Sequence, residues 1–249
     1  MADPRWFESD ALWEAMLPAL DAPARARVAE DDVRALSGLL GLSGRERVLD
    51  VGCGAGVHAV ALARRGHRVI GLDRTAALLF AAQARARAER VDVSWLLSDM
   101  RTFELEGPVD LAVCLQATFG YLPRLEDDLA VLRRLRGALA PGGRLVLDVL
   151  GKELAGATFY PRAWVSYGDT TLLEDRTVLA GWEFQESRWA VLRGGARSEH
   201  VTRQRLYSGT ELSRLLAEAG FAGVELFGGF DVRPYDRAAQ RLVAVGRRD

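Results

Sequence analysis

Metal-binding and disulfide-forming residues are scarce in this sequence. The chain holds two cysteines and three histidines. The histidines show no ligand spacing, so we predict no metal site. Cys53 and Cys114 both lie within strand-like runs. This placement favours a reduced pair of small buried side chains over a disulfide.

An excess of charge of either sign is missing as well. The formal net charge is -1, and the arginines are scattered among acidic residues, so we expect no basic surface for nucleic acid. No apolar run approaches the ~20 residues that a membrane-spanning helix needs. The N-terminal residues MADPRWFESD are acidic and lack the basic start and apolar stretch of a secretory signal. We therefore expect a soluble, cytoplasmic protein that binds neither nucleic acid nor a membrane.

What the chain does contain is an alternation of short β-like runs with helical ones. Its 249 residues, 49% of them apolar, suffice for one large domain with an elaborated insertion. The predicted strands cover residues 47–51, 67–72, 91–97, 109–115, 144–150, 224–227 and 240–246. The predicted helices cover residues 57–65, 76–90, 126–140, which ends in a Pro-Gly-Gly turn, and 208–220, which begins with a capping-box spacing. The alternation predicts an α/β fold with a Rossmann-like, seven-stranded, mostly parallel sheet and helices on both faces.

Residues 151–207 interrupt this alternation with aromatic, charge-alternating runs joined by turns. Such runs predict an inserted antiparallel β-sheet that roofs the substrate site. If Gly194-Gly195 is a two-residue hairpin turn, Trp189 lies opposite His200 and Glu186 opposite Arg203. The predicted organisation is an N-terminal helical cap (1–46), a ligand-binding core (47–150), the inserted sheet (151–207) and a C-terminal completion of the core (208–249).

The glycine-dense turn after the first predicted strand, VLDVGCGAG, is open to a ligand. At the carboxyl end of a parallel strand such a turn lets the ligand approach the backbone. A dinucleotide fingerprint G-x-G-x-x-G would need glycine where Val57 stands, whereas the glycines here fall at every second position. Asp73 ends the next strand, where it can accept hydrogen bonds from a ribose diol, and Asp99 can take an exocyclic adenine N–H. These acids suit a phosphate-free nucleoside better than a pyrophosphate.

Four stretches, in the order VLDVGCGAG, GLDRT, SDM and DLAVCLQATFGYL, resemble the class I S-adenosylmethionine-dependent methyltransferases. The resemblance covers residues 47–150 and, more loosely, the tail. It implies S-adenosyl-L-methionine as the cofactor. Its methionine end would contact Asp50, Gly52, Cys53, Gly54, Gly56, Leu115 and Gln116. The nucleoside would contact Asp73 at the ribose and Arg74, Asp99 and Met100 at the adenine.

The acids in this set also have purely structural interpretations. Asp50 is then an orienter of the glycine turn, Asp73 a strand-end cap and Asp99 a helix N-cap.

The acceptor side is less defined by motifs. Methyl transfer asks the protein to align and desolvate a nucleophile, so the absence of a nucleophile motif such as G-x-S-x-G is consistent with it. The segment Thr118 to Leu122 resembles the S/T-x-G-Y-L/F stretch of amino-sugar N-methyltransferases and not the N-P-P-Y type. Within it, Phe119 is predicted to line the acceptor pocket. Tyr121 is predicted to act in catalysis and substrate binding, or else to pack under the following helix.

Aromatic residues outside the core supply further acceptor-site candidates. One face of the predicted hairpin carries Trp189, His200, Thr202 and Gln204, and we predict that it faces the pocket; a merely packed Trp189 is the alternative. His200 is also a candidate catalytic residue. The other predicted substrate-binding residues are Trp164 and Tyr207. The N-terminal aromatic residues either fold over the cofactor as a lid or cap the sheet; they are Trp6, Phe7 and Trp13.

The leading hypothesis is an enzyme that methylates a small-molecule amine on nitrogen by direct in-line transfer. An amine only has to lose its proton before it attacks, whereas an alcohol demands a positioned base. The alternatives are O- or C-methylation with His200 or His58 as base, a nicotinamide-dependent oxidoreductase, and a non-enzymatic binding module. Val57 and the lack of a Tyr-x-x-x-Lys pair disfavour the oxidoreductase, and the intact acids disfavour the module. The expected partner is the small-molecule methyl acceptor, and the chain is expected to be a monomer or homodimer.

Overall fold

The computed structural model describes residues 3–249, without the side chain of residue 180. The strands of its core sheet are β1 (Arg47–Val51), β2 (Arg68–Asp73), β3 (Ser94–Leu97), β4 (Val109–Cys114), β5 (Leu139–Val149), β10 (Ala222–Phe227) and β11 (Leu242–Arg247). They lie in the order β10-β11-β5-β4-β1-β2-β3. Neighbouring strands from β5 to β3 are parallel, and β11 is antiparallel to both of its neighbours. The predicted seven-stranded, mostly parallel sheet is confirmed.

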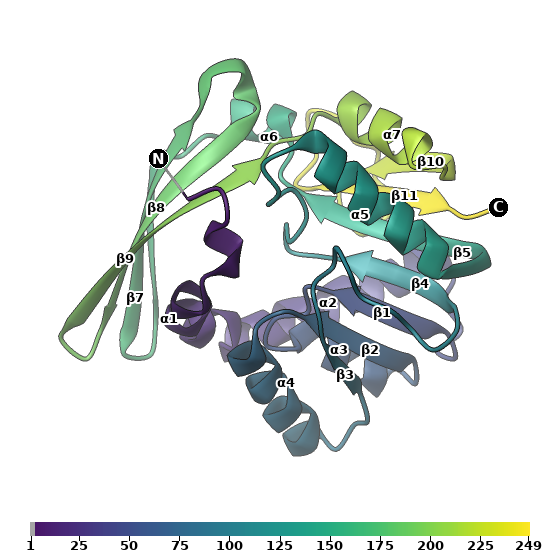
Figure 1. The fold of residues 1–249 in the computed structure, drawn as a ribbon, viewed down its shortest axis with the longest axis horizontal. Helices are drawn as coiled ribbons and strands as arrows, with labels where there is room; N and C mark the ends of the chain where they lie inside the picture. The colour runs from purple at the N-terminus through teal and green to yellow at the C-terminus, as the bar shows by residue number, and fades with distance from the viewer. Residues whose placement is uncertain (1–2) are drawn as a thin grey trace.

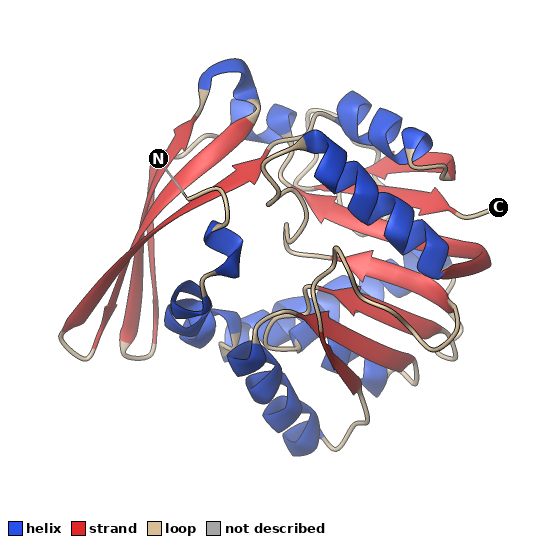
Figure 2. Ribbon diagram, in the orientation of Figure 1, coloured by secondary structure: helices blue, strands red, loops and turns tan. Residues whose placement is uncertain are grey.

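Helices cover both faces of this sheet (Figure 2). The helices are α1 (Asp10–Leu20), α2 (Pro23–Leu40), α3 (Val57–Arg64), α4 (Ala76–Glu89), α5 (Leu125–Ala138), α6 (Lys152–Ala157) and α7 (Gly209–Glu218), with 3-10 turns η1 (Trp6–Glu8) and η2 (Ala180–Trp182). Side chains alternate across a strand, so Val48 packs in the core under α2 and α3 while Leu49 packs in the core under α5 and α7. These two cores hold the sheet rigid beneath the turns that follow its strands.

Some predicted boundaries are wrong by a few residues. The strand predicted over 91–97 begins only at Ser94, and the helix predicted to reach residue 140 ends at Ala138. The Pro-Gly-Gly segment is part of β5, because Leu139 pairs with Val109 and the Gly142 N–H donates to the Arg248 carbonyl at 2.7 Å. Pairing with Arg248, near the end of the chain, thus makes a segment with turn-like residues part of a strand.

The inserted segment forms a separate antiparallel sheet. Its strands are β6 (Arg162–Tyr167), β7 (Thr170–Val178), β8 (Phe184–Arg193) and β9 (Ala196–Arg205), paired in sequence order. The turn at Gly194-Gly195 has two consecutive positive φ angles, 54° and 82°, as a tight hairpin between right-twisted strands requires. The register places Trp189 opposite His200, which confirms the predicted hairpin pairing.

The N-terminal segment lies between the two sheets (Figure 1). The Trp6 indole donates to the Arg203 carbonyl on β9 at 2.8 Å. On the other side, Arg101 forms a 2.8 Å ion pair with Glu8, and Arg74 donates to the Phe7 carbonyl at 3.1 Å. η1 and α1 are thereby bonded to both the added sheet and the core. Across the described chain, every helix is too short or too polar to cross a bilayer.

Candidate active site

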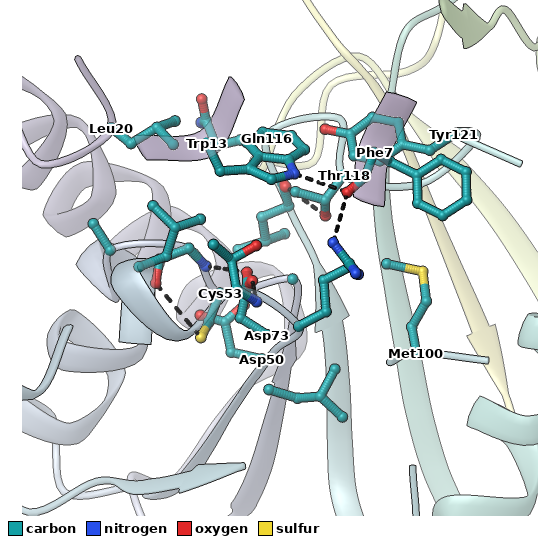
Figure 3. A pocket seen from close by; sticks show the side chains of 18 of the residues that line it. Phe7, Trp13, Leu20, Asp50, Cys53, Asp73, Met100, Gln116, Thr118 and Tyr121 are labelled. Carbon is teal, nitrogen blue, oxygen red and sulfur yellow. Dashed lines mark hydrogen bonds between the residues drawn. The ribbon is translucent and has the colours of Figure 1, made fainter. Parts of the chain in front are cut away.

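A cavity of about 210 Å³ opens at the carboxyl ends of the central strands (Figure 3). This is where open parallel sheets bind ligands. The predicted cofactor residues that line it are Asp50, Gly52, Cys53, Gly54, Asp73, Arg74, Asp99, Met100, Leu115 and Gln116. Chain segments up to 66 residues apart are thus gathered around one space, as the motifs predicted.

Gly56 is the predicted cofactor residue that does not line the cavity. It precedes α3 with φ of 75°, and a Cβ there would meet Ala82 at 2.7 Å and Trp95 at 2.8 Å. Gly56 therefore serves the close approach of the turn to α4 and β3. Gly54 differs, because the space around its Cβ position is open and its φ is 54°. The turn presents bare backbone to the cavity at that position.

Asp73 ends β2 with its carboxylate held by backbone donors. The Gly54 N–H donates to Oδ2 and the Thr75 N–H donates to Oδ1, each at 2.9 Å. The residue is 8% exposed, and burial raises its pKa. Each oxygen keeps a lone pair, because a carboxylate oxygen accepts two hydrogen bonds. A pre-oriented carboxylate of this kind fits the two hydroxyls of a ribose.

Asp50 is the next-to-last residue of β1 and is buried without full hydrogen bonding. Its Oδ2 atom has no partner among residues 3–249. Burial, with the nearby Asp73 charge, raises its pKa to about 6. A buried unpaired acceptor is costly, so a cationic or N–H-bearing ligand group would satisfy it. The ammonium group of a methionine moiety has that chemistry.

Asp99 follows β3 and is clamped by a residue that the sequence analysis did not single out. Arg101 donates to both carboxylate oxygens, at 2.9 Å and 2.7 Å. Burial alone would raise the pKa of Asp99, but these hydrogen bonds hold it below its usual value. The carboxylate therefore stays ionised and fixed at the adenine end predicted by the motifs.

The loop after β4 adopts a backbone conformation that no local sequence pattern predicted. Gln116 and Ala117 have φ of 56° and 58°, which is unfavourable for residues with a Cβ. Asp148 on β5 holds them, because its Oδ2 accepts the Gln116 N–H at 3.0 Å and its carbonyl accepts the Ala117 N–H at 3.0 Å. The Gln116 side chain also accepts from Arg25 of α2 at 2.9 Å. This strained loop turns the Gln116 backbone and side chain toward the cavity wall.

His58 lines the cavity but is already engaged. Its Nε2 lies 3.3 Å from Asp32 Oδ2. Asp32 in turn pairs with Arg241 at 3.1 Å, and Arg241 pairs with Asp148 at 2.7 Å. The imidazole is therefore part of a network that supports the Gln116 loop.

The N-terminal aromatic residues close one side of the cavity. Trp13 donates from its indole to the Phe7 carbonyl at 2.8 Å, and its ring stacks on Tyr121 at a centroid distance of 6.2 Å. Phe7, Trp13 and Tyr121 lie together on the upper side of the cavity in Figure 3. Burial raises the pKa of Tyr121, so its hydroxyl stays protonated. This placement is consistent with a lid and with a wall of the acceptor space.

The other predicted acceptor-site residues lie elsewhere. Trp164, Trp189 and His200 line a separate groove on the added sheet, and the side of the hairpin near His200 meets Trp6 and Leu12 of the N-terminal segment. Phe119 and Tyr207 are buried and stack on one another at 5.8 Å. The N-terminal segment lies between the added sheet and the core (Figure 1), which is a reason why Trp164, Trp189 and His200 do not line the cavity. Their predicted substrate contacts remain predictions.

Several lining residues carried no motif in the sequence. Asp128 is the most notable of them, because it is a buried carboxylate that lines the cavity together with Tyr121 and Leu122. Its place in the first turn of α5 is ordinary for an acidic residue, so sequence reasoning had no signal for it. Arg25 of α2 also lines the cavity, and no sequence motif marked it.

Comparisons with known proteins agree with this geometry. Residues 48–143 match a family model described as a methyltransferase domain. A protein of Geobacillus sp. (strain WCH70) named as a methyltransferase is 25% identical over 221 residues, which cover 84% of this chain and 87% of the relative.

Two solved structures share the fold. An S-adenosylmethionine-dependent methyltransferase from Clostridium acetobutylicum ATCC 824 superposes with a TM-score of 0.75 at 14% identity, covering 92% of this chain and 96% of that one. CalS10, an amino pentose methyltransferase from Micromonospora echinaspora, superposes with a TM-score of 0.63 at 24% identity, covering 91% and 94%. Both superpositions extend beyond the core into the added sheet.

Proposed function

We propose that this chain is a class I S-adenosylmethionine-dependent methyltransferase and that it methylates a small-molecule amine on nitrogen; the match of residues 48–143 to a methyltransferase-domain model supports the first part. The residues of the cavity fit the cofactor. Asp73 offers a pre-oriented carboxylate for the ribose, and the unpaired Asp50 oxygen and the bare Gly54 backbone suit the methionine end. When bound, S-adenosylmethionine supplies an activated methyl group on a positively charged sulfur. The chain's own residues bind and orient the two reactants and exclude water.

The charge of the cavity favours cationic ligands. Four carboxylates line it, and they belong to Asp50, Asp73, Asp99 and Asp128. The lining arginines are Arg25 and Arg74, which donate to Gln116 and to the Phe7 carbonyl. A surplus of negative charge in a partly enclosed site attracts positive ligands. Both an amine and a sulfonium cofactor meet this requirement.

The position of the histidines is the observation that favours a nitrogen acceptor atom over an oxygen. Among the described lining residues His58 is the one histidine, and its Nε2 is engaged with Asp32. His200 lines the groove on the added sheet and not the cavity. A free histidine base for an alcohol acceptor is therefore missing from the described lining, whereas an amine can lose its proton to solvent. The similarity in fold to an amino pentose methyltransferase supports the same choice.

Transfer of a tritiated methyl group to matched amine and alcohol acceptors tests the proposal. We expect the amines to be methylated, with a rate that climbs with pH toward the pKa of the amine. His200→Ala and His58→Ala should each lose less than about tenfold, well under the ~10²–10⁴ typical of a lost general base. A collapse of turnover in either variant, with binding of S-adenosylhomocysteine intact, would favour a hydroxyl or carbon acceptor instead.

A further inference from the structure

Asp128 is a buried carboxylate that lines the cavity. It lies in the first turn of α5 and is 1% exposed. It lines the cavity together with Gly120, Tyr121 and Leu122. These three residues follow the strained loop after β4 and belong to the segment that resembles the acceptor stretch of amino-sugar N-methyltransferases. The cofactor motifs leave Asp128 without a role.

The two oxygens of Asp128 have different surroundings. Oδ2 accepts the Tyr207 hydroxyl at 2.6 Å and the Arg205 Nε–H at 3.1 Å. Oδ1 has no hydrogen-bond partner within the described part of the chain. A residue that only joined α5 to β9 would gain by pairing both oxygens, because an unpaired buried acceptor is destabilising. Oδ1 is therefore the oxygen of Asp128 that is still unpaired and could accept a hydrogen bond from a ligand in the cavity.

The carboxylate is held firmly in place. Arg205 also binds Glu183 and donates to the Pro123 carbonyl at 2.9 Å, and its N–H donates to the Gly120 carbonyl at 2.7 Å. The Tyr207 ring stacks on Phe119, which restricts its motion. A binding group whose own partners lock its orientation needs little reorganisation when the ligand arrives.

The charged groups paired around Asp128 carry a net negative charge of one. Asp128 and Glu183 share the single cation of Arg205, Tyr207 is neutral, and Asp127 on the same helix adds negative potential. Burial raises the pKa of Asp128 to about 6, against the lowering effect of Tyr207 and Arg205. The carboxylate is thus ionised at neutral pH and close enough to neutrality to take up a proton.

We propose that Asp128 binds the amino group of the methyl acceptor through Oδ1, which rests on the N-methylation proposed above. The acceptor is then a primary or secondary amine that carries at least one N–H. One N–H donates to Oδ1, and the lone pair of the nitrogen is left free to attack.

The contact between Asp128 and the amine would also stabilise the charge that develops during the transfer. The N–C bond forms as the S–C bond breaks, sulfur keeps the electron pair of that bond, and the nitrogen becomes positively charged. A fixed carboxylate beside the nitrogen stabilises that developing charge. The excess proton then passes from the methylated nitrogen to Oδ1 and on to water as the product leaves.

Asp128→Asn tests the contact, with Asp127→Asn as the matched control. Asp127 is the neighbouring residue on the same helix, and its exposed side chain lies 3.6 Å from Arg124. The probes are cyclohexylamine and glucosamine, with cyclohexanol and glucose as the matched alcohols. We expect Asp128→Asn to lower kcat/KM for the amines at least 100-fold while the Kd for S-adenosylhomocysteine stays within threefold. Asp127→Asn should leave both within threefold.

A measurement on the unaltered enzyme covers the case in which Asp128→Asn does not fold. In the complex with S-adenosylhomocysteine, affinity for the amines, expressed against the concentration of unprotonated amine, should fall at least tenfold from pH 8 to pH 5, and affinity for the alcohols should not. Amine methylation that survives in Asp128→Asn, or amine binding indifferent to this pH change, overturns the role of Asp128 and leaves the proposed function standing. Methylation confined to the alcohols overturns the proposed function itself.

Discussion

At the scale of single residues, the cavity is built on buried carboxylates in two different states. Asp73 is satisfied by two backbone donors, whereas Asp50 and Asp128 each keep one oxygen without a partner in residues 3–249. A satisfied carboxylate is a rigid binding group, and an unsatisfied one stores an unfavourable free energy that a ligand can relieve. The two states predict different effects of substitution.

Asp73→Ala should weaken binding of S-adenosylhomocysteine by about 1–3 kcal/mol, the range for lost hydrogen bonds to a charged acceptor. The core packing should survive, because the residue ends a strand. Isothermal titration calorimetry of the variant measures the loss. Asp231→Ala is the control, since that residue is paired with Arg233 on the surface. Unchanged cofactor affinity in Asp73→Ala would mean that the ribose lies elsewhere.

Asp50 should impose a pH dependence on stability. Its pKa is raised from 3.8 to about 6 by burial, so between those values the folded state binds the proton more tightly than the unfolded state does. The contribution of this residue to the free energy of unfolding therefore falls as pH rises through that window. Asp50→Asn removes this loss.

The measurement is urea unfolding of both proteins at pH 4 and pH 7. We expect the difference in unfolding free energy to move in favour of Asp50→Asn at the higher pH. A difference that moves in favour of the unaltered protein would show that Asp50 is stabilised as an anion in the folded state.

At the scale of elements, local signals and long-range partners share control of the boundaries. The capping box of α7 is formed as predicted: Ser208 accepts the Glu211 N–H at 3.1 Å, and the Glu211 carboxylate accepts the Ser208 N–H at 2.8 Å. The end of α5 is different, because β5 begins directly after it through pairing with Val109. A helix start can be encoded within four residues, whereas a strand extent depends on its neighbours.

Ser208→Ala should lower the free energy of unfolding by about 1 kcal/mol, the usual effect of losing an N-cap side chain. Thr210→Ala, an exposed position on the same helix, should change it by less than about 0.5 kcal/mol. Chemical denaturation of the three proteins gives the comparison. Equal stabilities of Ser208→Ala and Thr210→Ala would mean that the cap is redundant with the Lys152–Glu211 ion pair at 2.6 Å.

At the scale of the whole molecule, the N-terminal segment connects the two sheets and closes the cavity. Its bonds to β9 and to the arginines after β2 and β3 link the added sheet to the cofactor end. A ligand that fills the cavity therefore contacts residues from the N-terminal segment and the core alike. Ligand binding should be measurable as global stabilisation.

S-adenosylhomocysteine at about 100 times its Kd should stabilise the folded state by about 2.7 kcal/mol, which raises Tm by about 5–10 °C for a chain of this size. NAD at the same concentration should leave Tm unchanged, because Val57 replaces the third glycine of the dinucleotide fingerprint and carboxylates line the nucleoside path. Thermal unfolding with each ligand decides between them. A Tm raised by NAD alone would overturn the cofactor assignment.

The sequence by itself determined the elements and the cofactor end. Strand–helix alternation, the glycine turn before Val57 and the acids at the strand ends are local features. A parallel sheet brings the carboxyl ends of its strands to one edge. The sheet topology therefore predicts that Asp50, Asp73 and Asp99 lie close together. The hairpin register around Gly194-Gly195 was also predictable from a local feature, because a two-residue turn sets the pairing of both strands.

Only the tertiary structure decided which residues line the rest of the cavity. The aromatic face of the hairpin was predicted to line the pocket, yet η1 and α1 lie in between and the cavity is lined by Phe7, Trp13 and Tyr121 instead. Asp128 gained its place through contacts with residues 77 and 79 positions away in the chain. Packing between segments so distant in sequence leaves no local pattern, because each partner is ordinary for its own helix or strand.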